Sequence, residues 1–208
     1  IDCAFEFRKA ADPLWKKRLG RQWVDVEPSG PAFIPDISFT SIDLKPADIP
    51  ELVAGLEIDH SVAPLHHTVG GAVAANARWS TFRDHHLHRY ASDRNDPLRE
   101  AHSRMSGYLH FGNISPFTMA RECVAHRTES ADKYLDELLT WRELAFNLCR
   151  FEPRHRTIAA IPEWAQKELA DHGDDPRTVY RDDELEFART DNELWNAAQR
   201  SYLRDGWM

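Results

Sequence analysis

Apolar and aromatic side chains recur at steps of three and four residues through the middle of the chain, and this spacing constrains the fold most. The clearest run comprises Tyr134, Leu138, Trp141, Ala145 and Leu148. A second run comprises Ala75, Trp79, Phe82, His86 and Tyr90, and its helix is predicted to end near Asp93. Each run places its members on one face of an α-helix, and no segment alternates strongly as a strand would. The chain from residue 70 onward is therefore predicted to be mainly α.

Capping signals predict three further helices, one over residues 116–126, one over residues 162–173 and one that starts at residues 190–193 and carries Trp195 and Tyr202. The first follows Ser115 as cap and has proline at its first helical position. The second is opened by Pro162 and closed near a glycine. The last follows Thr190-Asp191-Asn192-Glu193, which has the pattern of a capping box.

The first 65 residues differ in composition from the rest of the chain. They hold seven of the 12 prolines, which suits an irregular connector lying over a neighbouring domain better than a helical bundle. Within them we expect one short helix at Asp48–Leu56 and at most a brief extended piece at Val24-Asp25-Val26. We therefore divide the chain into an inter-domain connector or arm, residues 1–65, and a helical domain, residues 66–208.

Charge, hydropathy and cysteine content limit the class of protein. The chain has 26 Lys and Arg against 34 Asp and Glu, a formal net charge of −8. This balance counts against a non-specific nucleic-acid binder but allows a local basic groove. No apolar run reaches the roughly 20 residues that span a bilayer. Three widely spaced cysteines argue against a disulfide framework, so we expect a protein of a reducing compartment, cytoplasmic or, in a eukaryote, nuclear. We also expect the protein to be monomeric.

Two turns carry groups that can bind an anion. Thr68-Val69-Gly70-Gly71 precedes the first long helix, where free backbone N–H groups attract negative charge, although two adjacent glycines more often form an ordinary turn. Residues 102–106 combine two serine hydroxyls with Arg104, donors that can hold a pyrophosphate. A polar loop leading into an aromatic core contact is an equally good interpretation of this second segment.

Glu137 and Trp141 lie four residues apart and are expected to share one face of the central helix. A carboxylate beside an indole can hydrogen-bond a base edge while the ring stacks on the base, which suits an extruded nucleotide. Most aromatic residues at this spacing are core residues, so packing is the alternative for Trp141. The histidine groups His66-His67 and His85-His86-Leu87-His88 lack a second cluster at ligand spacing, so no metal site is expected.

Several strings, in this order along the chain, resemble one family. They are Asp93-Arg94-Asn95-Asp96-Pro97, the segment Ser106–Ser115 with its Tyr-Leu-His-Phe-Gly core, Trp141-Arg142-Glu143-Leu144-Ala145-Phe146-Asn147, Glu163-Trp164-Ala165-Gln166-Lys167, Leu194-Trp195-Asn196-Ala197-Ala198-Gln199 and Gly206-Trp207-Met208. These strings are similar to those of class II cyclobutane-pyrimidine-dimer DNA photolyases, within the photolyase and cryptochrome superfamily. The resemblance runs from about Leu56 to the last residue. It departs from the family at Gly107, where the family has proline, and at Arg104, where the family often has a small or polar residue.

The resemblance implies the first half of an all-helical FAD-binding domain. For the parent protein it implies an enzyme, a deoxyribodipyrimidine photolyase, which repairs cyclobutane pyrimidine dimers in UV-damaged DNA by light-driven electron transfer from reduced FAD. The alternatives are a cryptochrome-like flavin photoreceptor and a flavin-free structural domain. Because the chain lacks an initiator Met and stops before the helices that hold the flavin ring in the family, we expect a truncated piece that binds FAD weakly or not at all.

The same resemblance implies a role for each matching site residue. Glu137 would hydrogen-bond the dimer and Trp141 would pack against it, as catalytic residues. The cofactor contacts would come from Tyr90, His102, Ser103, Arg104, Met105, Ser106, Glu137 and Arg142. The DNA contacts would come from Arg94, Trp141 and Arg142, with Arg94 pointing into the gap that the extruded dimer leaves.

Overall fold

The computed structural model describes residues 4–21, 29–30, 36–65 and 67–207. Within these ranges the chain is helical and contains no strand, which confirms the mainly α expectation. The elements are α1 (Ala4–Leu19), α2 (Ile49–Ala54), α3 (Ala72–His85), η1 (Leu87–Arg89), α4 (Tyr90–Asp93), α5 (Ser106–His110), α6 (Pro116–His126), α7 (Glu129–Asp136), η2 (Glu137–Trp141), α8 (Arg142–Phe151), η3 (Ile158–Ala160), α9 (Glu163–Asp171), α10 (Asp182–Glu186) and α11 (Glu193–Asp205). The expected piece at Val24–Val26 and residue His66 lie outside the described residues.

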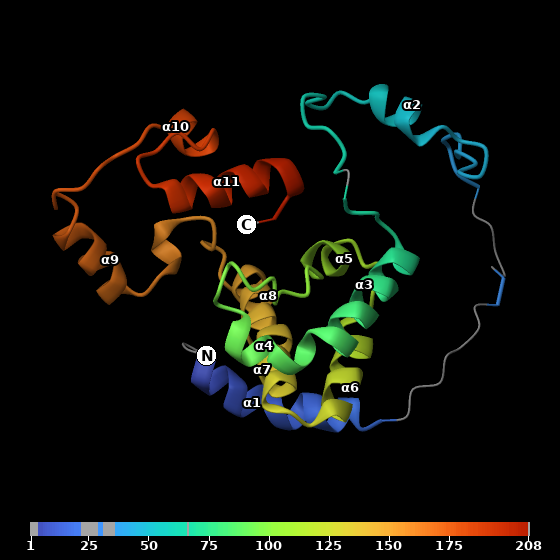
Figure 1. Cartoon of the computed structure of the whole chain (residues 1–208), viewed down its shortest axis with the longest axis horizontal. Helices are drawn as coiled ribbons and strands as arrows, with labels where there is room; N and C mark the ends of the chain where they lie inside the picture. The colour runs from blue at the N-terminus through green and yellow to red at the C-terminus, as the bar shows by residue number, and fades with distance from the viewer. Residues whose placement is uncertain (1–3, 22–28, 31–35, 66, 208) are drawn as a thin grey trace.

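The core lies among α3, α4, α6 and α7, at the centre of the molecule (Figure 1). Its centre is an aromatic cluster in which Trp79, Phe82, Tyr90 and Tyr134 have neighbouring ring centroids between 5.1 and 5.9 Å apart. Rings at such separations gain a favourable quadrupole interaction in addition to the burial of their apolar surface. The three aromatic residues of the run from Ala75 to Tyr90 are therefore buried together.

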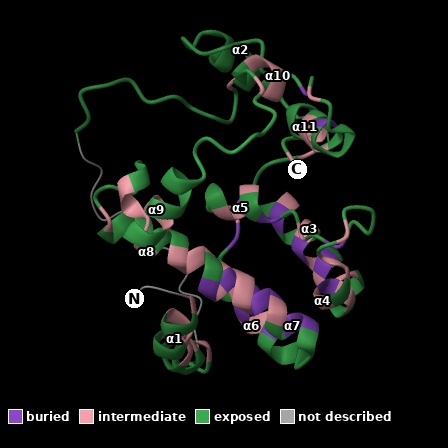
Figure 2. Cartoon of the chain, turned by 90° about the vertical axis from the view of Figure 1, so that its left-hand side faces the viewer, coloured by how far each residue is buried: buried purple, intermediate pink, exposed green. Residues whose placement is uncertain are grey.

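Burial falls off sharply from α8 onward, and the ribbon of α9, α10 and α11 is mostly green and pink (Figure 2). Between residues 152 and 207 only Ala188 and Asn196 are buried. Several large apolar side chains of this region are exposed, among them Trp164 at 71% and Leu194 at 72%. The C-terminal third therefore has little core of its own and is arranged around the bundle rather than within it.

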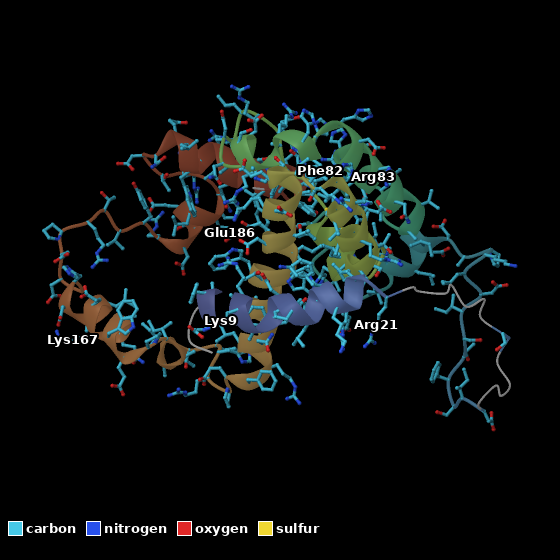
Figure 3. All side chains as sticks on the ribbon, turned by 90° about the horizontal axis from the view of Figure 1, so that it is seen from below. Lys9, Arg21, Phe82, Arg83, Lys167 and Glu186 are labelled. Carbon is cyan, nitrogen blue, oxygen red and sulfur yellow. The ribbon has the colours of Figure 1, made fainter. Side chains whose placement is uncertain are left out.

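Helix α1 was not expected, because the proline density of the first 65 residues suggested irregular structure. It spans 16 residues and contains Pro13. It crosses the bundle from below, with Lys9 on it and Arg21 just beyond its end (Figure 3). Arg8 reaches Asp136 with a 2.8 Å hydrogen bond, and Leu19 packs against the core. The arm therefore contributes a long helix to the bundle, whereas the predicted short helix at 48–56 is confirmed as α2 with Asp48 as its cap.

The run from Ala75 to Tyr90 is interrupted at His86, although its spacing predicted one helix that ends near Asp93. Ser130 of α7 is the physical cause. Its hydroxyl donates to the carbonyl of His88 at 2.9 Å and accepts from the N–H of Ala91 at 3.1 Å. A side chain inserted in this way replaces the helical ladder and divides the segment into α3, η1 and α4.

The central helix contains a π-helical turn that the regular spacing did not predict. Residues 137–141 form η2, between α7 and α8. A π-turn adds a residue to the helical repeat, which brings residue i toward residue i−5. The indole nitrogen of Trp141 accordingly donates to Asp136 Oδ2 at 3.3 Å. Single π-turns of this kind are frequent at functional sites.

The C-terminal helix begins at a different cap from the one predicted. Asn192, not Thr190, accepts a 3.0 Å hydrogen bond from the N–H of Trp195 and caps α11. Thr190 instead pairs with the buried Asn196, whose side-chain amide donates to the Thr190 carbonyl at 2.7 Å. The helix over 116–126 begins at Pro116 with Ser115 as cap, as predicted.

Candidate functional site

Two residues from distant parts of the chain meet where α4 ends and η2 begins. Arg94 Nη1 lies 3.0 Å from Glu137 Oε1, and Lys133 Nζ lies 2.7 Å from the same oxygen. The Glu137 side chain is 30% exposed. The hydrogen bond that Lys133 donates to Glu137 raises the pKa of Lys133, although partial burial of the amine opposes this. The carboxylate is therefore held by two cations at the edge of the core.

Asp136 forms the neighbouring anchor and joins this pair to Trp141. It receives hydrogen bonds from Arg8 at 2.8 Å, from Lys133 at 3.3 Å and from the Trp141 indole at 3.3 Å. Burial opposes ionisation of Asp136, but the hydrogen bonds from Arg8, Lys133 and Thr140 outweigh it and hold the pKa of the carboxyl below its usual value. Lys133 touches both carboxylates, so Glu137 and the half-exposed Trp141 belong to one polar network.

A cleft of about 610 Å³ opens beside this network. Its walls come from α1, α4 and α7, and they include Arg8, Trp15, Arg94, Lys133 and Asp136. Of the predicted site residues only Arg94 lines it. The cleft could not be predicted from the sequence, because one of its walls comes from α1, a helix that the proline pattern did not indicate. Asp136, which accepts from Trp141, lies five residues before it, outside α-helical spacing.

Tyr90 is placed in the aromatic core rather than on an open surface. Its ring packs edge-on against Phe82 and Tyr134, and the residue is 7% exposed. Burial raises the pKa of the Tyr90 hydroxyl, the charge of Glu137 adds to this, and the charge and hydrogen bond of Arg94 oppose it. The Tyr90 hydroxyl therefore interacts with the Arg94–Glu137 pair, through the charges of both residues and a hydrogen bond with Arg94.

The segment 102–106 is fixed from two sides. Arg78 of α3 donates to the carbonyls of Ser103 at 2.8 Å and His102 at 3.2 Å. The Tyr134 hydroxyl donates to Ser103 Oγ at 3.1 Å, and burial raises the pKa of Tyr134. Met105 is buried at the start of α5. The remaining members are exposed: His102, Arg104 and Ser106.

The other candidate features lie around this centre. Arg142 pairs with Glu143 at 2.5 Å, and its guanidinium lies 4.6 Å from the Phe146 ring centroid. The turn before α3 is tied to the next helices, because the Gly71 N–H donates to Asn113 Oδ1 at 3.4 Å. Gly71 has a φ of +94°, which glycine adopts without strain. Among the described residues no three His, Cys, Asp or Glu side chains are arranged to hold a metal ion.

The chain is similar in sequence to several known proteins. The chain is 36% identical over 175 residues to the deoxyribodipyrimidine photo-lyase of Methanothermobacter thermautotrophicus, a match that covers 83% of the chain and 38% of that protein. The chain is homologous to deoxyribodipyrimidine photolyases. The photolyase of Potorous tridactylus is 31% identical over 81% of the chain, and that of Oryza sativa subsp. japonica is 42% identical over 57% of it.

These photolyases are longer than the chain, which spans between 24% and 38% of the length of the curated relatives that it matches. No family model matches the sequence. In the part of the chain that the structure describes, no helix is both long and apolar enough to cross a membrane.

Proposed function

We propose that this chain forms the first part of the FAD-binding domain of a class II photolyase, which repairs cyclobutane pyrimidine dimers in UV-damaged DNA. The observation that carries the proposal is the 3.0 Å ion pair between Arg94 and Glu137. These are two residues to which the family resemblance assigns contact with the lesion and its surrounding DNA. Their meeting across 43 positions of sequence, at the edge of a cleft, supports one shared site.

The donors on the segment 102–106 suit the diphosphate of FAD. The Ser106 hydroxyl is exposed at the start of α5, and the backbone of the segment is held by Arg78 and Tyr134. Serine hydroxyls and backbone N–H groups are common phosphate ligands because they donate without adding bulk. FAD, when bound, supplies the electron that splits the dimer.

The side chains of the chain itself then position the lesion. Glu137 would accept a hydrogen bond from the dimer, and the half-exposed Trp141 ring would pack against it. In the free protein Arg94 forms an ion pair with Glu137. DNA binding would therefore move Arg94 from the carboxylate to the gap that the extruded dimer leaves, and it would free Glu137 for the lesion. Lys133 would remain ion-paired with Glu137.

The absorbance spectrum of the purified full-length protein that contains this chain, with and without added FAD, tests the cofactor assignment. A flavin band that stays with the protein through gel filtration supports the proposal, and its absence after reconstitution points to the flavin-free structural alternative. Illumination of a dimer-containing oligonucleotide by the flavin-loaded protein then separates repair from a photoreceptor role. A flavoprotein that leaves the dimers intact contradicts the repair assignment.

A further inference from the structure

A second concave site lies away from the Glu137 network, on the side of α3 that faces residues 98–104. Its volume is about 300 Å³, and it is lined chiefly by Arg78, His86, Arg89, Arg99, Glu100 and Arg104. Four of these six side chains are guanidinium groups. In a chain whose net charge is −8, so dense a group of arginines around one small pocket requires an explanation.

The positive charge of this pocket is only partly compensated. Arg89 lies 3.7 Å from Asp93 and Arg99 lies 3.4 Å from Asp96, carboxylates that do not line the pocket. Arg78, in contrast, donates to two backbone carbonyls, which carry no charge. Arg104 forms no ion pair within 4.0 Å among the described residues, although its charge helps to lower the pKa of Asp205. Glu100 is therefore one carboxylate among four cations.

Arg78 and Arg104 repel one another across this pocket. Burial lowers the pKa of Arg78, and the charge of Arg104 lowers it further, while Tyr108 and Glu100 oppose these effects. A partly buried guanidinium held next to a like charge is unfavourable unless an anion lies between them. The loop nevertheless holds Arg104 in this place, at a φ of +55° that is uncommon for a residue other than glycine.

His86 adds a neutral donor to the same pocket. Its Nδ1 lies 3.0 Å from Arg89 Nη2, which donates to it. A neutral imidazole whose Nδ1 accepts carries its proton on Nε2. Burial lowers the pKa of His86, with Arg89 and Arg78 contributing, so the neutral form is favoured while the pocket is empty. Nε2–H then remains free to donate to a ligand oxygen.

We propose that this pocket binds a phosphate group carried by a small molecule. Planar guanidinium forks match the oxygens of a phosphate, and their hydrogen bonds to it are charge-assisted. About 300 Å³ is at the lower limit of ligand sites, which suits a phosphate with at most a sugar attached. Of the residues assigned to FAD, only Arg104 lines the pocket. The pocket therefore shares Arg104 with the proposed flavin site, and its other lining residues lie outside that site.

Thermal unfolding of the 208-residue chain in inorganic phosphate, against sodium chloride at equal ionic strength, tests the site. A ligand of the folded state raises the melting temperature in a saturable manner, from which an apparent dissociation constant follows. We expect Arg104→Gln to weaken phosphate binding about tenfold. Arg104→Lys, which keeps the charge, should restore part of it. Arg156→Gln, an equal loss of charge at an exposed position outside the pocket, should leave it unchanged.

Four results would overturn the proposal. The proposal is wrong if phosphate raises the melting temperature no more than chloride does. It is also wrong if Arg104→Gln responds to phosphate as wild type does. Binding of a single-stranded oligonucleotide that is sensitive to Arg104→Gln, without binding of phosphate or AMP, makes the pocket a nucleic-acid contact instead. Flavin content is measured on the same samples because Arg104 is shared with the proposed flavin site. Loss of phosphate binding with flavin content unchanged supports the proposal, whereas loss of both places Arg104 in the flavin site and overturns it.

Discussion

The indole nitrogen of Trp79 donates a 2.7 Å hydrogen bond to Glu122 Oε2, which joins α3 to α6 across 43 positions of sequence. Trp79 is 2% exposed, so its N–H has little access to water as an alternative acceptor. The same carboxylate oxygen accepts from Arg83 Nη1 at 2.6 Å. Glu122 therefore accepts a hydrogen bond from the buried Trp79 indole and also forms an ion pair with Arg83 near the surface.

Glu122→Ala is expected to lower the free energy of unfolding by about 1–3 kcal/mol, because it leaves the buried indole N–H without an acceptor. Glu122→Gln also removes the charge that pairs with Arg83 but keeps an oxygen that can accept. Glu122→Gln should therefore lower the free energy of unfolding less than Glu122→Ala does. Urea denaturation of the two variants measures the difference. Equal losses would mean that the ion pair, rather than the buried hydrogen bond, provides the stabilisation.

Cys123 and Cys149 are expected to differ strongly in thiol reactivity. Burial raises the pKa of Cys123 to about 12, so almost no thiolate exists at neutral pH. Cys149 is exposed on α8. Brief treatment of the folded chain with iodoacetamide, followed by peptide mass spectrometry, should label Cys149 and leave Cys123 unmodified until denaturant is added. Early labelling of Cys123 would contradict the buried position of α6.

Asp136 should make stability depend on pH in the acid range. Its pKa is lowered in the folded state, so its contribution is present above the ordinary carboxyl pKa and is lost as pH falls through the folded value. We expect the stability difference between wild type and Asp136→Asn to be constant near neutral pH and to shrink from about pH 5 downward. Urea denaturation of both proteins across this range measures it. A difference that grows in acid would contradict the Arg8 and Lys133 contacts.

Gly107 and Gly112 provide a matched pair of substitutions around α5. Gly107 lies within the helix, and a Cβ there would meet no atom within 4 Å. Gly107→Ala should therefore stabilise the chain by about 0.4–1 kcal/mol, since it restricts the unfolded state. Gly112 has equal space but a φ of +68°, so Gly112→Ala should destabilise it. Thermal melts that shift in the same direction for both would contradict the assigned backbone conformations.

The helical spacing of apolar residues predicted part of the core. Trp79, Phe82, Tyr90 and Tyr134 are buried, whereas Trp141 and Leu148 of the clearest run are exposed. The break at His86 could not be predicted, since it depends on Ser130 from another helix. The family resemblance proposes the residues of the candidate site one by one, and their roles remain predictions. The cleft beside them could not be predicted, because one wall comes from α1 and the anchor of Trp141 comes from a π-turn.

The most direct test of the central claim is light-dependent repair by the full-length protein that contains this chain, assayed as loss of dimers from an oligonucleotide, with flavin content measured in parallel. The account predicts that Glu137→Gln lowers repair about 10-fold or more, as expected for loss of a charge-assisted contact, and leaves flavin content unchanged. Glu163→Gln, at an exposed position on α9, should repair like wild type. Unchanged repair in Glu137→Gln, or loss of flavin from it, would contradict the assignment of Glu137 to the lesion.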